Sequence, residues 1–310
     1  MHFSVVVPVY NEESNILVLD KEIRQVVDKL GSYEIIYVND GSKDNSLAQL
    51  RKIHNAVIIN LNKNYGQATA LDAGFKASRG DIVISMDSDL QNDPRDIPKM
   101  LEKLQKENLD VVAGWRKNRK DKSGIKILTR TGRALRKLLI KDDVHDTGCT
   151  LRVYRREAVK TLDIGGEMHR YILAILRWKG FRIGEIEVNH RPRINGQTKY
   201  GYNKAVRGFI DLLYIWFIQK YSQRPLHIFG ELGIFSFLTG FIIEFILATM
   251  KIFRDIDLSG NAWLVIGFFL MLIGIVFFSF GIVIDLLLKI HLNNSPYEKR
   301  YYIRDIIGRI

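Results

Sequence analysis

Three short polar segments hold the residues best suited to chemistry. They read Asp87-Ser88-Asp89-Leu90-Gln91, Asn39-Asp40-Gly41-Ser42 and Pro8-Val9-Tyr10-Asn11-Glu12. Side chains two positions apart in extended chain point to the same side, so Asp87, Asp89 and Gln91 form one row of oxygen donors. Such oxygens suit a hard cation, Mg²⁺ or Mn²⁺, that would bridge a nucleotide diphosphate. An isolated Asp-x-Asp is more often a solvated turn, but its place after an apolar run, near two other polar segments, favours a metal site.

The elements that must position these segments form an alternating pattern over residues 3–114. Runs of strand length lie at 3–9, 34–39, 56–61, 81–86 and 110–113, and amphipathic stretches lie near 13–29, 44–54, 67–78 and 95–108. Such alternation predicts a mostly parallel α/β sheet covered by helices on both faces. Ligands of open sheets bind beyond the carboxyl ends of the strands, where all three polar segments fall. The sequence has no GxGxxG after the first strand and no GxxxxGK[ST], which disfavours glycine-rich phosphate cradles.

The basic charge of the chain belongs to one region. The 310 residues carry a net charge of +12, and residues 1–227 hold 39 Lys+Arg against 27 Asp+Glu, whereas residues 228–310 hold seven of each. The mean hydropathy of −0.04 therefore averages a charged domain and an apolar tail. Cys149 is the only cysteine, which excludes an intramolecular disulfide and a cysteine-cluster metal site and fits a reducing compartment.

Two apolar stretches predict a membrane hairpin. Residues 228–250 contain two charged residues and residues 263–288 contain one, and each stretch exceeds the roughly 20 helical residues that a bilayer core requires. The alternative is a pair of buried core helices. The connector at 251–262 is short, so both flanks lie on one side, and basic residues in the tail place that side in the cytoplasm. We therefore expect an integral membrane protein with two crossings and cytoplasmic termini, in the plasma membrane of a prokaryote or the endoplasmic reticulum of a eukaryote.

The polar segments, in their order along the chain from Pro8 to Gln91, resemble those of family 2 glycosyltransferases with the GT-A fold. Further motifs look like the polyprenyl-phosphate branch of that family, typified by dolichol-phosphate mannose synthase, and the resemblance covers about residues 3–225. These further motifs are Asp146-Thr147-Gly148-Cys149, Gly166-Glu167-Met168-His169-Arg170, His190-Arg191-Pro192-Arg193 and Gly196-Gln197-Thr198-Lys199-Tyr200-Gly201.

The resemblance implies an activity and a layout. The activity is inverting transfer of a hexose, with mannose and glucose favoured, from a GDP- or UDP-hexose to polyprenyl or dolichyl phosphate, assisted by Mg²⁺ or Mn²⁺. The expected layout is a Rossmann-like GT-A domain at 1–205, an amphipathic juxtamembrane helix at 206–227, the two crossings within 228–290, and a basic tail at 291–310. The partners are the nucleotide sugar, the lipid phosphate and the bilayer, with a homo-oligomer left open.

The resemblance also implies roles for single residues. Asp89 and Gln91 match metal ligands, and Asp87 lies near the ribose, the metal or both. Asp146 matches an acidic residue near the acceptor, as a base, an orienting group or neither. Positions that hold the base and ribose are matched by Pro8, Tyr10, Asn11, Glu12 and Asp40, and the cations on the donor diphosphate by Arg193 and Lys199. The expected catalytic set is Asp89, Asp146, Arg193 and Lys199.

A basic stretch at 116–141 suggests the acceptor side. It carries 11 Lys+Arg and one acidic residue, and Arg130 and Arg133 would share one helix face. We expect these two arginines and Arg116 to meet the lipid phosphate. The alternative is a surface helix that is attracted to anionic lipid without specificity.

Other functions are weaker alternatives. Processive polysaccharide synthases of the same superfamily share a Gln-x-x-Arg-Trp motif, but this chain has Ala174 before Arg177-Trp178 and too few crossings for a polymer channel. A non-catalytic, membrane-anchored nucleotide-sugar-binding protein is a second alternative, although the segment Asp87 to Gln91 keeps all of its expected metal-binding residues. Nucleic-acid binding lacks a recognisable module or an aromatic stacking platform.

Overall fold

The computed structural model describes residues 2–117, 144–166, 168–192, 216–217, 225–254, 257–258, 260–294 and 303–308. It divides into two compact units. The first unit contains residues 1–212 together with 299–310, and the second contains residues 213–298. The first unit holds the candidate site.

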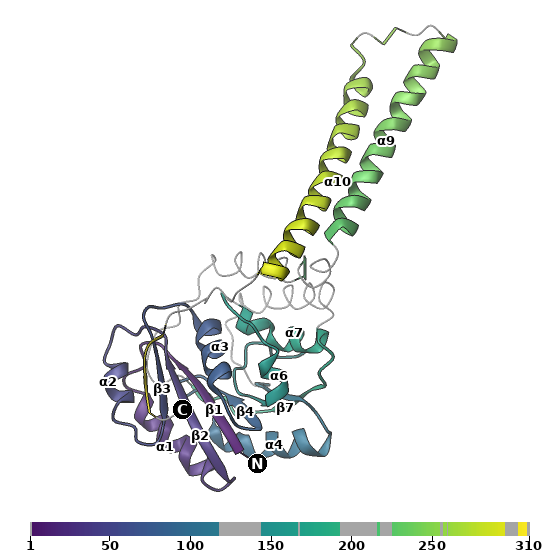
Figure 1. The fold of residues 1–310 in the computed structure, drawn as a ribbon. Coiled ribbons are helices and arrows are strands. Elements are labelled where there is room, and N and C mark those ends of the chain that lie inside the picture. The colour runs from purple at the N-terminus through teal and green to yellow at the C-terminus, as the bar shows by residue number, and fades with distance from the viewer. Residues whose placement is uncertain are drawn as a thin grey trace. The chain divides into compact units, whose positions relative to one another are not determined.

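A mostly parallel sheet forms the centre of the first unit (Figure 1). Among the described residues it has eight strands in the order β7-β5-β6-β4-β1-β2-β3-β8. Strand β6 is antiparallel to β4 and β5, and β8 is antiparallel to β3, whereas the other pairs are parallel. The strands are β1 His2–Val9, β2 Ser32–Asn39, β3 Val57–Leu61, β4 Ile82–Ser85, β5 Val111–Trp115, β6 Arg152–Arg155, β7 Ile183–Glu187 and β8 Ile303–Ile307. The predicted fold class is thereby confirmed.

Helices cover both faces of the sheet because successive strand side chains point to opposite sides. In β1, Val5 and Val7 belong to one core, and Val6 belongs to the other. The first core packs under α1 Ile16–Val27, α2 Ser46–Leu50 and α4 Ile97–Lys106, which follows the short helix η1 Pro94–Asp96. The second core packs under α3 Gln67–Ala77, α6 Arg156–Lys160, η2 Met168–Tyr171 and α7 Ile172–Trp178. Buried residues are spaced three or four apart in α1, as expected for a helix lying on a sheet.

The second unit is a pair of long apolar helices, α9 Pro225–Arg254 and α10 Ala262–Asn294, which lie side by side (Figure 1). Both predicted crossings fall within them, and both are long and apolar enough to cross a membrane. Their outward side chains are large and apolar, as at Phe235, which is 72% exposed. Gly233 and Gly274 face each other so closely that an added Cβ on either would meet the backbone carbonyl of the other at 2.6–2.7 Å. These features suggest membrane anchoring.

The chain then returns to the first unit as strand β8, the yellow strand beside β3 in Figure 1. Gly308 follows it at φ +101°, and a Cβ there would lie 2.4 Å from the carbonyl oxygen of Ala56, so only glycine fits without a shift. This strand was not predicted from the sequence, where residues 291–310 were expected to form only a basic tail.

Candidate active site

A cavity of about 270 Å³ opens at the carboxyl ends of the parallel strands. It gathers residues from the ends of β1, β2 and β4, from the loop after β3 and from the start of α3. Its lining comprises Pro8, Val9, Tyr10, Glu12, Asp40, Asn64, Gly66, Gln67, Ala70, Asp87, Ser88 and Asp89. Five of the six residues predicted at strand ends for the nucleotide sugar therefore surround one space, together with Asp89 from the predicted metal site.

The turns after β1 and β2 are hydrogen-bonded to each other. The backbone N–H of Asn11 donates to Ser42 Oγ (3.0 Å), and the N–H of Lys43 donates to Asn11 Oδ1 (2.8 Å). Asn11 adopts φ +56°, a left-handed conformation that asparagine tolerates better than most residues. Asn11 is therefore part of the frame of the cavity and is not one of its lining residues.

Asp40 is held by the loop after β3. Its Oδ1 accepts from the N–H of Tyr65 (2.7 Å) and its Oδ2 from the N–H of Gly66 (2.9 Å). Burial raises the pKa of Asp40 above its usual value, and these two hydrogen bonds oppose that rise. Gly41 follows at φ +62°, where a Cβ would lie 2.3 Å from the backbone carbon of Lys63. The carboxylate is thus fixed in place, and each oxygen retains a lone pair directed to other donors.

Asp87 and Asp89 form the acidic wall of the cavity. Asp87 Oδ1 accepts from Gln67 Nε2 (2.6 Å). Burial, and next the charge of Asp89, raise the pKa of Asp87 to about 6, although the positive charges of Arg116 and Arg152 lower it in part. Two carboxyl groups so close together favour a cation between them and the substrate.

The predicted third ligand, Gln91, is placed differently. Its backbone N–H donates to Asp89 Oδ1 (3.1 Å), and its carbonyl accepts from the N–H of Arg191 (2.9 Å). Gln91 is not among the residues that line the cavity. Its role as a metal ligand stays a prediction.

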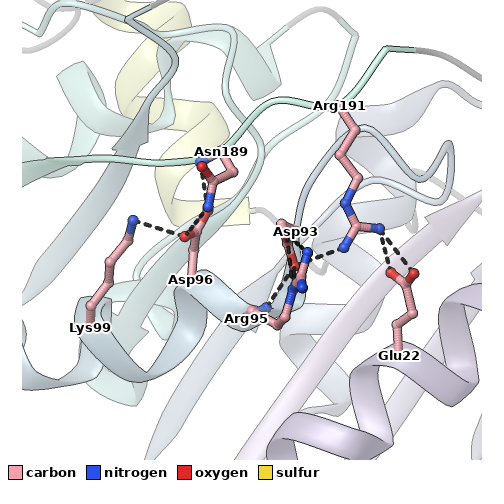
Figure 2. Close-up of polar contacts among 7 residues, drawn as sticks. All are labelled: Glu22, Asp93, Arg95, Asp96, Lys99, Asn189 and Arg191. Carbon is pink, nitrogen blue, oxygen red and sulfur yellow. Dashed lines mark hydrogen bonds and ion pairs between the residues drawn. The ribbon is translucent and has the colours of Figure 1, made fainter.

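An ionic anchor follows the acidic wall and fixes it to two distant parts of the chain (Figure 2). Arg191 pairs with Asp93 (Nη2 to Oδ1, 2.9 Å) and with Glu22 on α1 (Nη1 to Oε2, 2.7 Å). Arg95 also pairs with Asp93 (2.7 Å). Burial would raise the pKa of Asp93, but the hydrogen bonds from Arg95 and Arg191 outweigh it and lower the pKa to about 2. We call Glu22, Asp93, Arg95 and Arg191 the Asp93 anchor.

A second contact in the same view strengthens this attachment. Asn189 donates through its backbone N–H (2.6 Å) and its side chain (3.0 Å) to Asp96, which also pairs with Lys99 on α4 (2.8 Å) (Figure 2). Asn92 and His190 form an isolated antiparallel bridge between the two segments. Residues 189–191 are thereby attached along the segment that leaves the acidic wall.

Arg116 and Asp146, predicted on the acceptor side, are paired with each other. The guanidinium donates from Nε to Oδ2 (2.7 Å) and from Nη2 to Oδ1 (3.0 Å), a bidentate arrangement. Burial acts against the charged form of Arg116, but Asp146 outweighs it and raises the arginine's pKa. A carboxylate engaged in this way is better suited to orienting Arg116 than to accepting a proton.

Several predicted residues lie outside the described residues. These are Arg130, Arg133, Arg193 and Lys199, together with nearly all of the expected juxtamembrane helix at 206–227. Sequence reasoning also missed cavity residues, namely Asn64, Gly66 and Gln67 after β3. The signal was available, because β3 is also a parallel strand whose carboxyl end is followed by polar residues and a glycine.

The acidic wall fits a divalent cation in chemistry and in charge. Its donors are carboxylate oxygens, and the pKa of Asp87 is raised first by burial and then by the negative charge of Asp89, which Arg116 and Arg152 offset only in part. Within the described residues, no group of three or more His, Cys, Asp or Glu side chains could hold a metal ion. Asp87 and Asp89 would therefore share a cation with other oxygens, such as those of a diphosphate.

The sequence is similar to those of known proteins. Residues 4–163 match the model of glycosyl transferase family 2. Dodecaprenyl-phosphate galacturonate synthase of Rhizobium johnstonii is 34% identical over 99% of this chain and 93% of that protein. Undecaprenyl-phosphate 4-deoxy-4-formamido-L-arabinose transferase of Proteus mirabilis is 32% identical over 98% of this chain and 94% of that protein.

A solved structure shares the fold. Glucosyl-3-phosphoglycerate synthase from Mycobacterium tuberculosis, in complex with Mn²⁺ and UDP-glucose, superposes with a TM-score of 0.57 at 21% identity. The match covers 69% of this chain and 78% of that one. At this identity the likeness supports the GT-A architecture alone.

Proposed function

This chain belongs to glycosyl transferase family 2, in its polyprenyl-phosphate branch, and we propose that it transfers a hexose or hexose-derived sugar from a UDP- or GDP-sugar to a polyprenyl phosphate. The observation that carries the proposal is the cavity at the strand ends, where Asp40, Asp87 and Asp89 meet in one space. The apolar helix pair supports a lipid acceptor. Undecaprenyl-type and dolichyl phosphates both fit this chemistry.

The sugar is the least constrained part of the proposal. Mannose and glucose follow from the resemblance of the motifs, whereas the two relatives carry galacturonate and 4-deoxy-4-formamido-L-arabinose in their names. Galacturonate keeps the hexose skeleton, and the arabinose derivative does not. A donor panel therefore needs neutral hexoses, a uronic acid and an amino-sugar derivative.

The proposed reaction is a single displacement at the anomeric carbon. An oxygen of the lipid phosphate forms the new bond to that carbon while the bond to the nucleoside diphosphate breaks, which inverts its configuration. A phosphate monoester is already largely dianionic near neutral pH, so positioning matters more than removal of a proton. A divalent cation, Mg²⁺ or Mn²⁺, would supply charge stabilisation for the departing diphosphate.

Named residues take the remaining roles in this proposal. Asp87 and Asp89 hold the cation, with Gln91 as a further candidate, and Asp40 orients the nucleoside. Arg116, oriented by Asp146, binds the acceptor phosphate. Arg130 and Arg133 are proposed to assist at the acceptor, and Arg193 and Lys199 at the donor diphosphate.

The proposed topology has both termini of the chain in the cytoplasm. Strand β8 follows α10 and pairs with β3 of the sheet that precedes α9. A chain that leaves and rejoins one sheet must cross a bilayer an even number of times, which supports a hairpin of two crossings. The basic residues of the tail support the cytoplasmic side.

The test uses the full-length protein in detergent or nanodiscs. Labelled UDP- and GDP-sugars from the panel are incubated with a polyprenyl phosphate and Mg²⁺ or Mn²⁺, and label is measured in the organic phase. We expect one donor class to label the lipid and EDTA to abolish the transfer. Labelled polymer in place of labelled lipid would favour a processive synthase, and nucleotide binding without transfer would favour a non-catalytic binding protein.

A further inference from the structure

The C-terminal strand β8 is connected to the candidate donor site by a row of polar side chains. Asn39 on β2 is opposite Asn60 on β3, and Asn60 is opposite Asp305 on β8. Asn39 Nδ2 donates to Asn60 Oδ1 (2.8 Å), and Asn60 Nδ2 donates to Asp305 Oδ1 (2.6 Å). Both asparagines are almost completely buried, at 2% and 3% exposure. We call these three residues the tail ladder.

Asp305 is aligned with this row by an irregularity in its strand. Asn60 pairs with Asp305, but the next residue, Leu61, pairs with Ile303, so Arg304 is the extra residue of a β-bulge. Bulges of this kind change the direction of a side chain, and they occur often beside active sites. Here the bulge brings a carboxylate opposite a buried amide.

The chemistry of Asp305 sets the direction of the ladder. An ionised carboxylate only accepts hydrogen bonds, so Asn60 must present its NH₂ group to Asp305 and its carbonyl oxygen to Asn39. Asn39 must in turn present its NH₂ group to Asn60. The carbonyl oxygen of Asn39 is thereby directed toward the following turn, where it accepts from the N–H of Ser42 (3.4 Å).

That turn frames the nucleotide side of the cavity. It contains Asp40, which lines the cavity, and Ser42, whose Oγ accepts from the backbone N–H of Asn11 in the turn after β1. A change in the amide orientation of Asn39 would remove the acceptor beneath Ser42 and loosen both turns. The ladder therefore ends at the residues that shape the donor pocket.

We propose that β8 is a working part of the donor site and that Asp305 and Asn60 are positioning residues for the nucleotide. The chain segment that follows the helix pair acts through Asn39 on the Asp40-Gly41-Ser42 turn. Because this inference rests on the proposed function, it requires a nucleotide in the cavity that Asp40 lines. It extends that function by assigning a role to a strand outside residues 4–163, which match the family model.

Point variants of the full-length protein test the proposal. Asp305→Ala removes the terminal acceptor, whereas Asp305→Asn keeps an oxygen that Asn60 can reach. Asn60→Ser shortens the middle of the ladder. Arg51→Ala is the matched control, because Arg51 is exposed and its only described contact with the ladder is a 3.7 Å ion pair with Asp305.

We expect Asp305→Ala and Asn60→Ser to raise the donor KM about 3- to 10-fold while kcat changes less than about twofold, which is the loss expected for one ordinary hydrogen bond. The donor KM of Asp305→Asn should stay within about twofold of wild type, because the amide oxygen can still accept from Asn60. The donor KM of Arg51→Ala should also stay within about twofold, because an exposed ion pair contributes little. The acceptor KM should not change. Equal donor KM values for all four variants would overturn the proposal, as would a loss with Asp305→Asn as large as that with Asp305→Ala.

Two further measurements separate this inference from the proposed function. Binding of UDP and GDP by calorimetry and hydrogen exchange of the amides at 40–43 require no transfer. Asp305→Ala should weaken the nucleotide that binds wild type and speed exchange of the Ser42 amide. If wild type transfers no sugar but these effects appear, the ladder holds and the transferase assignment fails. If wild type transfers sugar and exchange at 40–43 is unchanged in Asp305→Ala, the ladder has no such role.

Discussion

Asp87 and Asp93 lie six residues apart in one segment, and the protein treats their charges in opposite ways. Asp87 faces the cavity beside Asp89, and burial with that second carboxylate raises its pKa to about 6. Asp93 is buried too, but Arg95 and Arg191 lower its pKa to about 2. The protein supplies cations for the structural carboxylate and leaves the cavity carboxylates with an excess of negative charge. The comparison teaches that local charge compensation separates an anchor from a site in an acidic stretch.

Among the variants that test this comparison, Asp89→Ala should have the largest effect on transfer. Loss of the carboxylate that is proposed to hold the cation should lower transfer about 10²–10³-fold, as expected for removal of a major stabilising group. Label in the organic phase measures the effect. Melting of the full-length variant, followed by near-ultraviolet circular dichroism, should show no loss of stability, because Asp87 loses a repulsive neighbour. Undiminished turnover would remove the metal assignment from the acidic wall.

The substitutions Asp93→Asn and Asp87→Asn should change the stability of the protein in opposite directions. Asp93→Asn removes the charge that Arg95 and Arg191 share, and should lower the apparent melting temperature by about 3–8 °C. Asp87→Asn keeps an acceptor for Gln67 and removes a poorly compensated charge, so the metal-free protein should melt at the same or a slightly higher temperature at pH 7. A fall of equal size in both variants would contradict the proposed difference between anchor and site.

The pH dependence of stability should divide in the same way in the metal-free protein. The pKa of Asp87 is raised from 3.8 to about 6 in the folded state. The stability that this shift contributes is therefore present below about pH 4 and is lost as the pH rises through 6. The pKa of Asp93 is lowered to about 2, so its contribution is present above about pH 4 and is lost as the pH falls through 2. Melting temperatures between pH 2 and 7 measure both. Asp87→Asn should remove only the upper loss and Asp93→Asn only the lower one.

Much of the fold was predictable because its signals are local. Strand-length apolar runs predicted β1 to β5, and residues at strand ends predicted half of the cavity lining. The contacts that joined distant segments were not predictable. Glu22 and Arg191 are 169 positions apart, and nothing in either neighbourhood indicates the partner. The pairing of Arg116 with Asp146 likewise depends on the arrangement of β5 and the loop before β6.

Strand β8 shows a different limit. Ile303–Ile307 has only five residues, two of them charged, and it follows two long apolar helices that suggest a membrane boundary. An edge strand of this kind has weak periodicity, and its partner β3 is supplied by tertiary structure alone. In the sequence Asp305 looks like one charge of a polar tail, yet it accepts a hydrogen bond from the buried Asn60. Tail residues were therefore the least predictable part of the candidate site.

The smallest expected effect distinguishes the two arginines of the Asp93 anchor. Both lie close to Asp93, at 2.7 Å for Arg95 and 2.9 Å for Arg191, but the Arg95 side chain is 74% exposed and that of Arg191 only 25%. Solvent screens the exposed pair, so Arg95→Ala should leave the melting temperature unchanged within about 1 °C. Arg191→Ala should lower it by about 2–5 °C, because Arg191 also pairs with Glu22 and each lost hydrogen bond to a charged group is stronger than a neutral one.

Arg191→Lys is the matched control for that difference. It keeps the charge but cannot bridge Asp93 and Glu22 with one planar group, so it should fall between wild type and Arg191→Ala. Circular dichroism melts of the three arginine variants in one detergent compare them directly. If Arg95→Ala destabilises the protein as much as Arg191→Ala, then proximity to Asp93 and not burial of the bridge controls the anchor. In that case the number of cations near Asp93, whether exposed or buried, would separate Asp93 from Asp87, and burial of the Arg191 bridge would add nothing.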